Sequence, residues 1–180
     1  MLLAPGTHTF GPDNATLTVH TTKTGAAARA GHNLVIEVRT WSATADVGDE
    51  TTMSLIADSH SLRVIEASGG MQPLGDEEMA SIAKTIDAEV LQGTTIAFAS
   101  TEVRETADGE GLAVTGELEL NNVTHPVSFE LRPDGDGGMG ATAVFRQSDW
   151  GMKPYSALFG TLKVVDEVEV SMRAKEQSSG

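Results

Sequence analysis

The 180-residue chain contains no cysteine. Disulfide frameworks, thiolate nucleophiles and cysteine-ligated metal sites are therefore excluded. Aromatic residues are also scarce, with five Phe, two Trp and one Tyr. A core must be built mainly from aliphatic side chains, and hydrophobic residues at 39% of the sequence are sufficient for a globular one.

Basic residues and long apolar runs are the next shortages. Twelve Lys and Arg face 26 Asp and Glu, so the net charge is −14 and the pI is near 4.6. Phosphate backbones and anionic bilayers repel such a chain at long range, and we expect no nucleic-acid partner. No stretch of 18 apolar residues is present, so we expect no stable membrane insertion and only peripheral membrane contact.

The ends of the chain carry few signals. Residues 1–6 lack the basic and apolar regions of a signal peptide. We expect a cytoplasmic protein as given, and a periplasmic or secreted one if a signal peptide was removed. The length fits one domain, which we place over 1–175, with 176–180 as a disordered tail.

Alternation of apolar and polar residues is the main positive signal, because it places apolar side chains on one face of a strand. Leu112, Val114 and Leu118 alternate with polar residues, and the same phase resumes at 127–131 after Asn121-Asn122, which predicts a hairpin. The longest strand is expected near the C-terminus, over 162–172. Further strands are predicted over 10–21, 33–46, 50–65, 94–104 and 139–147, for a total of about eight.

One segment changes period. Met79, Ile82, Ile86 and Val90 lie on one face of a helix, which we predict over about 76–91. Three carboxylates occupy its first turn, and Gly93 follows its end. The apolar face should pack across the wall or end of the strand assembly.

Eight mostly sequential antiparallel strands with one inserted helix predict an all-β protein, best closed as a barrel because closure removes exposed edges. A two-sheet sandwich is the alternative. Several expected inner positions are small, namely Ala57, Gly116, Ala141 and Ala143. Small inner residues favour an open cavity over a barrel filled with side chains.

Three stretches carry a family resemblance. The first is the hairpin over 114–129 (VTGELELNNVTHPVSF), the second is 148–152 (SDWGM) with the late DEV at 166–168, and the third is the strand, helix and strand passage over 55–101. Together they resemble the YceI family of polyisoprenoid-binding, lipocalin-like domains. The resemblance implies an eight-stranded antiparallel barrel whose interior holds a long-chain lipid of isoprenoid, quinone or fatty-acyl type, for storage, transport or sensing, without catalysis or a required cofactor.

Inward residues of the predicted strands should line the lipid tunnel, and loops at one barrel end should form its mouth. A homodimer is left open. The expected lining residues are Leu34, Ile36, Val38, Met53, Leu55, Phe98, Val114, Leu118, Phe129, Leu131, Phe145, Leu162 and Val164, and the expected mouth residues are Arg29, His32, Trp150, Lys153, Tyr155 and Leu158.

Catalytic and metal motifs give little support to an enzyme. The five histidines lack the spacing of a zinc site, so no metal is expected. Asp58-Ser59-His60 contains the residue types of a hydrolase triad, but neighbours on a strand point to opposite faces. The alternative to a lipid binder is an acidic β interaction or stress-associated module with a filled barrel, and an enzyme using His32 or His60 as a base is a weaker third hypothesis.

Overall fold

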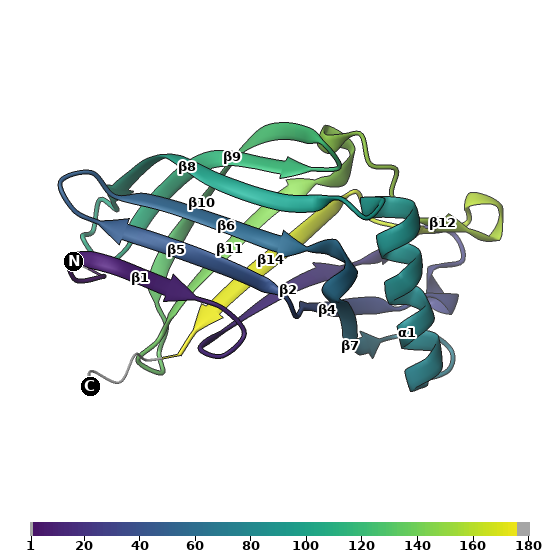
Figure 1. The fold of residues 1–180 in the computed structure, drawn as a ribbon. Coiled ribbons are helices and arrows are strands. Elements are labelled where there is room, and N and C mark those ends of the chain that lie inside the picture. The colour runs from purple at the N-terminus through teal and green to yellow at the C-terminus, as the bar shows by residue number, and fades with distance from the viewer. Residues whose placement is uncertain (1, 176–180) are drawn as a thin grey trace.

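A computed structural model describes residues 2–175. More than half of the chain is extended, and the strands run obliquely around a common interior (Figure 1). The expected tail, residues 176–180, lies outside the described residues. The strands are β1 (Gly6–Phe10), β2 (Ala15–Thr21), β3 (Lys23–Thr24), β4 (Asn33–Val38), β5 (Trp41–Val47), β6 (Thr52–Asp58), β7 (Leu62–Ser68), β8 (Thr95–Glu105), β9 (Leu112–Leu120), β10 (Val123–Pro133), β11 (Met139–Arg146), β12 (Ser156–Ala157), β13 (Leu162–Val164) and β14 (Glu167–Ala174).

Eleven of these strands form one antiparallel sheet in the order β1-β5-β6-β8-β9-β10-β11-β14-β2-β4-β7. Three passes of the chain are each divided into two strands by a bend: β1 and β2, β4 and β5, and β6 and β7. Because β1 pairs with β5 while β2 pairs with β4, the first pass lies beside the second along both halves. Counted as passes, the sheet has eight members, and each pairs with two neighbours. The antiparallel lipocalin-like barrel expected from the sequence is confirmed, although bends raise the number of strands in the sheet from eight to eleven, and the sandwich is not observed.

The β9–β10 hairpin shows how local sequence positions the barrel wall. Leu120 pairs with Val123, so Asn121 and Asn122 form a two-residue turn with φ values of 51° and 59°. Positive φ at both positions is the type I′ geometry, whose twist matches that of the strands it joins, and Asn tolerates this conformation. The register then places Leu118, Val127 and Phe129 on the inner face, as alternation predicted.

The predicted helix is present over the expected range. It consists of α1 (Asp76–Thr85) followed by a π-helical turn, η3 (Ile86–Leu91), and it ends at Gln92 and Gly93, both with positive φ. Glu78 accepts a hydrogen bond from the Gly75 amide at 2.6 Å and thereby caps the first turn. The helix packs on β7 and stands across one end of the barrel (Figure 1).

The prediction of one long C-terminal strand was wrong. The extended segment breaks at Val165 and Asp166: β14 stays in the barrel, whereas β13 pairs with β12 and β3 in a separate three-stranded sheet. At this break, the Asp166 carboxylate accepts hydrogen bonds from the amide and the hydroxyl of Ser148. Asp166 therefore binds the loop that contains Trp150 at the point where the two strands separate. The alternating pattern could not reveal this change of partner.

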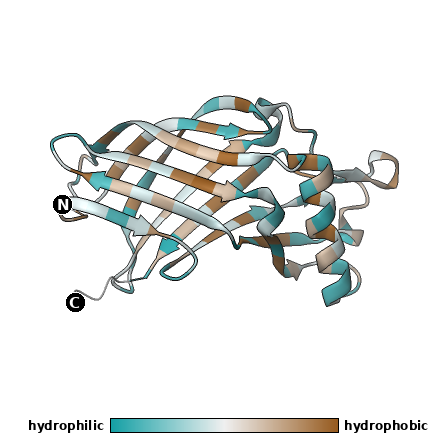
Figure 2. Ribbon diagram, viewed as in Figure 1, coloured by the Kyte–Doolittle hydropathy of each residue, from teal (hydrophilic) through white to brown (hydrophobic). Residues whose placement is uncertain are grey.

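Apolar side chains gather in two clusters inside the barrel, and brown and teal alternate along the strands in Figure 2. The larger cluster includes Leu3, Trp41, Leu112 and Val114. We call its side the closed end, which is formed by the turns at 11–14, 48–51, 106–111 and 134–138. The smaller cluster consists of Leu118, Leu120, Trp150 and Met152. It lies at the opposite side, the mouth end, with the helix and the segments 22–33, 69–75 and 147–166.

Candidate functional site

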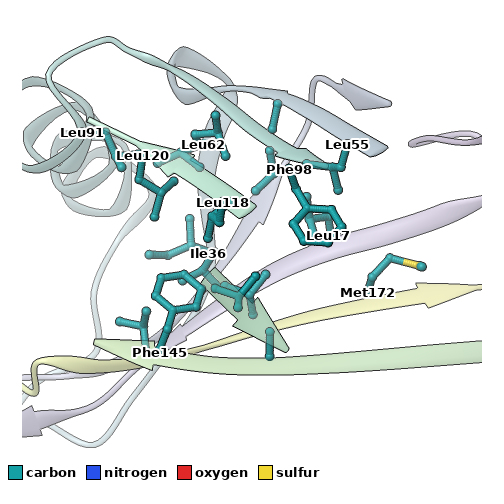
Figure 3. Close-up of a pocket in the computed structure, with 18 of the residues that line it drawn as sticks. Leu17, Ile36, Leu55, Leu62, Leu91, Phe98, Leu118, Leu120, Phe145 and Met172 are labelled. Atoms are coloured by element: carbon teal, nitrogen blue, oxygen red, sulfur yellow. The ribbon is translucent and has the colours of Figure 1, made fainter. Parts of the chain in front are cut away.

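A cavity of about 500 Å³ occupies the barrel between the two clusters. Its walls come from all eight passes, and α1 and η3 border it at the mouth end. Figure 3 shows side chains from opposite walls, such as Leu55 and Phe145, converging on this space. The lining residues are Phe10, Leu17, Val19, Thr21, Leu34, Ile36, Val38, Ala43, Thr44, Ala45, Met53, Ser54, Leu55, Ala57, Leu62, Ser81, Ile82, Thr85, Ile86, Val90, Leu91, Ile96, Phe98, Leu118, Leu120, Val127, Phe129, Leu131, Ala141, Ala143, Phe145, Gln147, Met152, Tyr155, Val164, Val168, Val170 and Met172.

The chemistry of the lining is almost entirely aliphatic and aromatic. Within residues 2–175, no charged side chain borders the cavity. Seven lining residues are polar: Thr21, Ser81, Thr85, Gln147 and Tyr155 lie at the mouth end, and Thr44 and Ser54 lie in the wall strands β5 and β6. The cavity therefore combines a mainly apolar body with a concentration of polar groups at one end, a division that fits an amphiphile.

Eleven of the thirteen lining residues expected from the sequence border the cavity, and Val114 and Leu162 do not. Val114 is packed into the closed-end cluster and is 1% exposed. Leu162 lies in β13, outside the barrel sheet, and its side chain fills the space beside Gly31. Both differences arise because alternation identifies the face of a strand but not how far along the barrel the packed core extends.

Small residues leave the space that they were expected to leave. Ala57, Ala141 and Ala143 all line the cavity. Gly116 has a different role, because a Cβ atom there would come within 2.5 Å of the Phe98 ring and 2.4 Å of the Ala99 carbonyl oxygen. The glycine thus lets an aromatic ring lie against the barrel wall.

The helix closes part of the mouth end with the face predicted from its period. Ile82, Ile86 and Val90 line the cavity, together with the polar Ser81 and Thr85. The spacing of the apolar residues predicted that this face packs across the barrel. The same spacing was the signal that could have placed these residues in the cavity lining. Lining positions in β2 and β14 had the same alternating signal but were not included in the expected set.

An ion pair ties the helix to the bend between β6 and β7. The Nδ1 atom of His60 lies 2.5 Å from the Oδ2 atom of Asp87, which belongs to η3. The hydrogen bond and the charge of Asp87, with a smaller contribution from Asp58, raise the pKa of His60 above its ordinary value. The second oxygen of Asp87 is buried and has no hydrogen-bond partner within residues 2–175. His60 is therefore the main group that compensates this carboxylate.

Asp58, Ser59 and His60 do not assemble a hydrolase relay. Asp58 accepts a hydrogen bond from the His60 backbone amide at 2.9 Å and caps the short turn η2 (Ser59–Ser61). Ser59 is 1% exposed, and its hydroxyl has no partner among the described residues. These residues shape the bend and do not border the cavity.

Of the six expected mouth residues, only Tyr155 lines the cavity. Trp150 is instead buried, 1% exposed, in the mouth-end cluster, where its indole N–H donates to the Leu118 carbonyl at 2.8 Å and its ring meets Phe145 edge-on. Arg29, His32, Lys153 and Leu158 lie in loops outside the cavity. The aromatic and basic composition indicated the correct end of the barrel but not which side chains face inward.

His32 has a partner that explains its position. Its Nε2 atom lies 2.7 Å from the Gln72 carbonyl oxygen, and its ring occupies the space that a side chain at Gly70 would need. It thereby joins the 22–33 and 69–75 segments. Within residues 2–175, no group of three His, Asp or Glu side chains is arranged to hold a metal ion.

Comparison with known proteins places this geometry in a family. The YceI-like domain family model matches residues 76–175, which include the helix, the β9–β10 hairpin and the 148–152 motif. A UPF0312 protein of Enterobacter sp. (strain 638) is 55% identical over 40 residues, which cover 22% of this chain and 20% of that protein. The sequence similarity to this curated relative therefore spans about a fifth of its length.

Solved structures share the fold at low sequence identity. BcnA of Burkholderia cenocepacia matches with a TM-score of 0.61 and 12% identity, over 88% of this chain and 94% of that chain. The YceI protein of Campylobacter jejuni matches with a TM-score of 0.52 and 14% identity, over 79% and 85%. Within residues 2–175, no helix is long and apolar enough to cross a membrane. The motifs, the barrel and the family match agree, and the chain belongs to the YceI-like domain family.

Proposed function

We propose that this protein binds a single apolar or amphiphilic lipid chain, of isoprenoid, quinone or fatty-acyl type, inside the barrel. The uncharged 500 Å³ cavity is the observation that carries the proposal. Its volume falls in the range of pockets that bury small organic ligands. Each methylene group transferred from water into such a cavity contributes about 0.8 kcal/mol, so a chain of modest length suffices for tight binding.

The polar groups indicate how such a ligand would be oriented. Ser81, Thr85, Gln147 and Tyr155 can hydrogen-bond a hydroxyl, carbonyl or quinone oxygen at the mouth end. The apolar tail would then extend toward the closed end, past Phe98 and Phe129, whose rings lie 5.5 Å apart. This orientation leaves the head group nearest the helix.

Binding without chemical conversion fits the lining best. A reacting ligand would need a nucleophile, an acid or a base beside it, and the described lining offers only neutral hydroxyl and amide groups. We therefore propose a non-enzymatic carrier that needs no cofactor. The filled-barrel alternative from the sequence is disfavoured, because its interior would have to be packed with side chains.

Two adjacent residues of β11 provide a matched test. Ala143 lines the cavity, whereas Val144 points outward and is 53% exposed. We expect Ala143→Phe to fill the cavity and weaken binding of the fluorescent apolar probe N-phenyl-1-naphthylamine at least tenfold in delipidated protein. Val144→Phe should leave the affinity within twofold. Mass spectrometry of an organic extract of the purified wild type should identify the resident chain.

Two results would contradict the proposal. One is a wild type that yields no lipid on extraction and does not bind the probe after delipidation. The other is equal loss of probe binding in the Ala143→Phe and Val144→Phe variants, provided that circular dichroism shows both to be folded.

A further inference from the structure

The small sheet at the mouth end forms a projecting tip, which we define as residues 22–31 and 153–164. It contains β3, β12 and β13, and the turns η1 (Ala28–Ala30) and η5 (Leu158–Gly160). The β12 loop extends outward beyond α1 (Figure 1). The tip is therefore the part of the mouth end that can meet a flat surface first.

Apolar side chains at the tip face solvent. Phe159 is fully exposed at 108% of its reference area, Leu158 is 54% exposed and Tyr155 is 44% exposed. Leu158 and Phe159 also have positive φ values of 51° and 55°, a backbone conformation that is costly for large side chains. Other exposed large apolar residues, such as Ile56 and Val144, occur singly on the barrel wall. The tip is therefore unusual in presenting adjacent apolar groups to solvent.

The charge of the tip is opposite to that of the protein. Lys23, Arg29, Lys153 and Lys163 lie within it, and its sequence contains no Asp or Glu, although the net charge of the chain is −14. None of the four forms an ion pair within the described part of the chain. Lys23 is partly buried and donates from Nζ to the Gly31 carbonyl at 2.7 Å, whereas Arg29, Lys153 and Lys163 are exposed. The carboxylates of α1 belong to a helix packed on β7 and not to the small sheet. Positive charge around exposed aromatic and aliphatic groups complements an anionic bilayer surface.

The tip is continuous with the cavity. Tyr155 and Val164 belong to the tip and also line the cavity. A bilayer in contact with Leu158 and Phe159 would thus adjoin the polar end of the ligand site.

We propose that the projecting tip docks on anionic phospholipid bilayers, with Leu158 and Phe159 entering the interface and the exposed Arg29, Lys153 and Lys163 facing lipid phosphates. The net negative charge still repels such a surface at long range, but it is screened beyond about 10 Å at 0.1 M salt, where the local charge of the tip decides the interaction. The closed-end turns contain only acidic charged residues, so their repulsion also orients the molecule with its tip toward the surface. Docking goes beyond the proposed ligand site and does not require it.

Vesicle flotation at 0.1 M salt tests this proposal. We expect the wild type to bind vesicles of equal phosphatidylglycerol and phosphatidylcholine at least tenfold better than pure phosphatidylcholine. The double variant Leu158→Ser/Phe159→Ser should lose at least tenfold in binding to the anionic vesicles. Both side chains are exposed, so the fold should persist, and probe binding in the cavity provides an independent check.

Matched controls separate tip chemistry from overall charge and hydrophobicity. Lys163→Glu and Arg173→Glu change the net charge equally, but Arg173 is in β14 near the closed end. We expect Lys163→Glu to weaken binding severalfold and Arg173→Glu to leave it within twofold. Val144→Ser removes an exposed apolar group from the wall and should also have no effect.

Two outcomes would overturn docking. The first is a wild type that does not float with anionic vesicles, in which case a protein would be the partner of the tip. The second is a loss of binding in the control variants as large as in the tip variants. The ligand proposal is judged separately. If the wild type binds the apolar probe but not vesicles, only the docking proposal is contradicted. If it binds vesicles but its cavity yields no lipid and does not bind the probe, only the ligand proposal is contradicted.

Discussion

The two ends of the barrel are joined by the same strands but differ in the charged and apolar side chains that they expose. The four closed-end turns contain seven carboxylates and no Lys or Arg, and two of these carboxylates cap backbone amides. Asp134 accepts hydrogen bonds from the amides of Asp136 and Gly138, at 3.1 and 2.8 Å, and Asp108 accepts one from Glu110 at 3.0 Å. The seven carboxylates are Asp13, Asp49, Glu50, Asp108, Glu110, Asp134 and Asp136.

The mouth end also carries seven carboxylates, five of them in the helix, but it adds five Lys and Arg residues and exposed apolar groups in its longer loops. The helix is attached through His60 and Asp87. In two of these acidic turns the carboxylates satisfy backbone amides of the turn itself, and charged turns of this kind favour solvent. Exposed apolar groups do not stabilise the isolated fold, and at the tip they are the basis of the docking that we propose. The comparison predicts that stability and the proposed binding are separated along the barrel axis.

A pair of leucines should give the largest contrast. Leu112 is 6% exposed in the closed-end cluster and does not line the cavity, whereas Leu158 is exposed at the tip. We expect Leu112→Ala to lower the free energy of unfolding by about 2–5 kcal/mol. Leu158→Ala should change it by less than about 0.5 kcal/mol. Urea denaturation measures both, and similar losses in the two variants would contradict the separation of the ends.

Ligand removal should affect the mouth end selectively. A ligand at a hundred times its dissociation constant stabilises the folded state by about 2.7 kcal/mol. We expect delipidation to lower the melting temperature and to speed hydrogen exchange in residues 76–91. Exchange in the turn at 106–111 serves as the internal control, and equal acceleration at both places would argue against a local effect of the ligand.

The closed-end turn between β8 and β9 depends on one buried hydroxyl. Thr106 is 7% exposed, and its Oγ1 atom donates to Asp108 and accepts from the Gly111 amide at 2.9 Å. Thr106→Val leaves that amide without its side-chain acceptor and should cost about 1–3 kcal/mol of stability. Thr106→Ser is the matched control, because it keeps the hydroxyl, and chemical denaturation should show it to be the milder change.

The smallest effects should be the pH responses of the two ends, which have opposite signs. Hydrogen bonds from Thr106, the Glu110 amide and Arg132 hold the pKa of Asp108 well below its usual range. Its contribution to stability is therefore present above pH 4 and lost as the pH falls through the lowered pKa. Asp108→Asn should remove this part of the acid sensitivity measured by thermal melting, and a titration identical to the wild type would contradict the assignment.

At the mouth end, the raised pKa of His60 reverses the direction. The ion pair with Asp87 contributes fully below pH 6.5 and is lost as the pH rises through the raised pKa. Hydrogen exchange in the η3 turn should therefore accelerate on the alkaline side. His60→Gln should abolish this pH dependence while leaving the acid response of the Asp108 turn unchanged, and an unaltered alkaline response would contradict the role of His60.

Local patterns predicted much of the barrel. Alternation identified the inner faces, Asn121-Asn122 identified a hairpin, and the apolar period identified the helix over 76–91. The same reasoning failed where one alternating segment serves two sheets, as at Val165 and Asp166, because pairing partners are distant in sequence. Trp150 was misplaced for a related reason: composition cannot show whether an aromatic group in a loop turns inward.

The sequence by itself determined the strand faces, the helix, the small inner residues and the lack of cysteine, because each depends on composition or on neighbours within a few residues. Only the tertiary structure decided where the packed core ends and the cavity begins. It places Val114 in the packed core and Leu118 in the cavity lining. It also gathered Lys23, Arg29, Lys153 and Lys163 into one tip. Charges more than a hundred residues apart become a surface only when strand pairing brings their loops together.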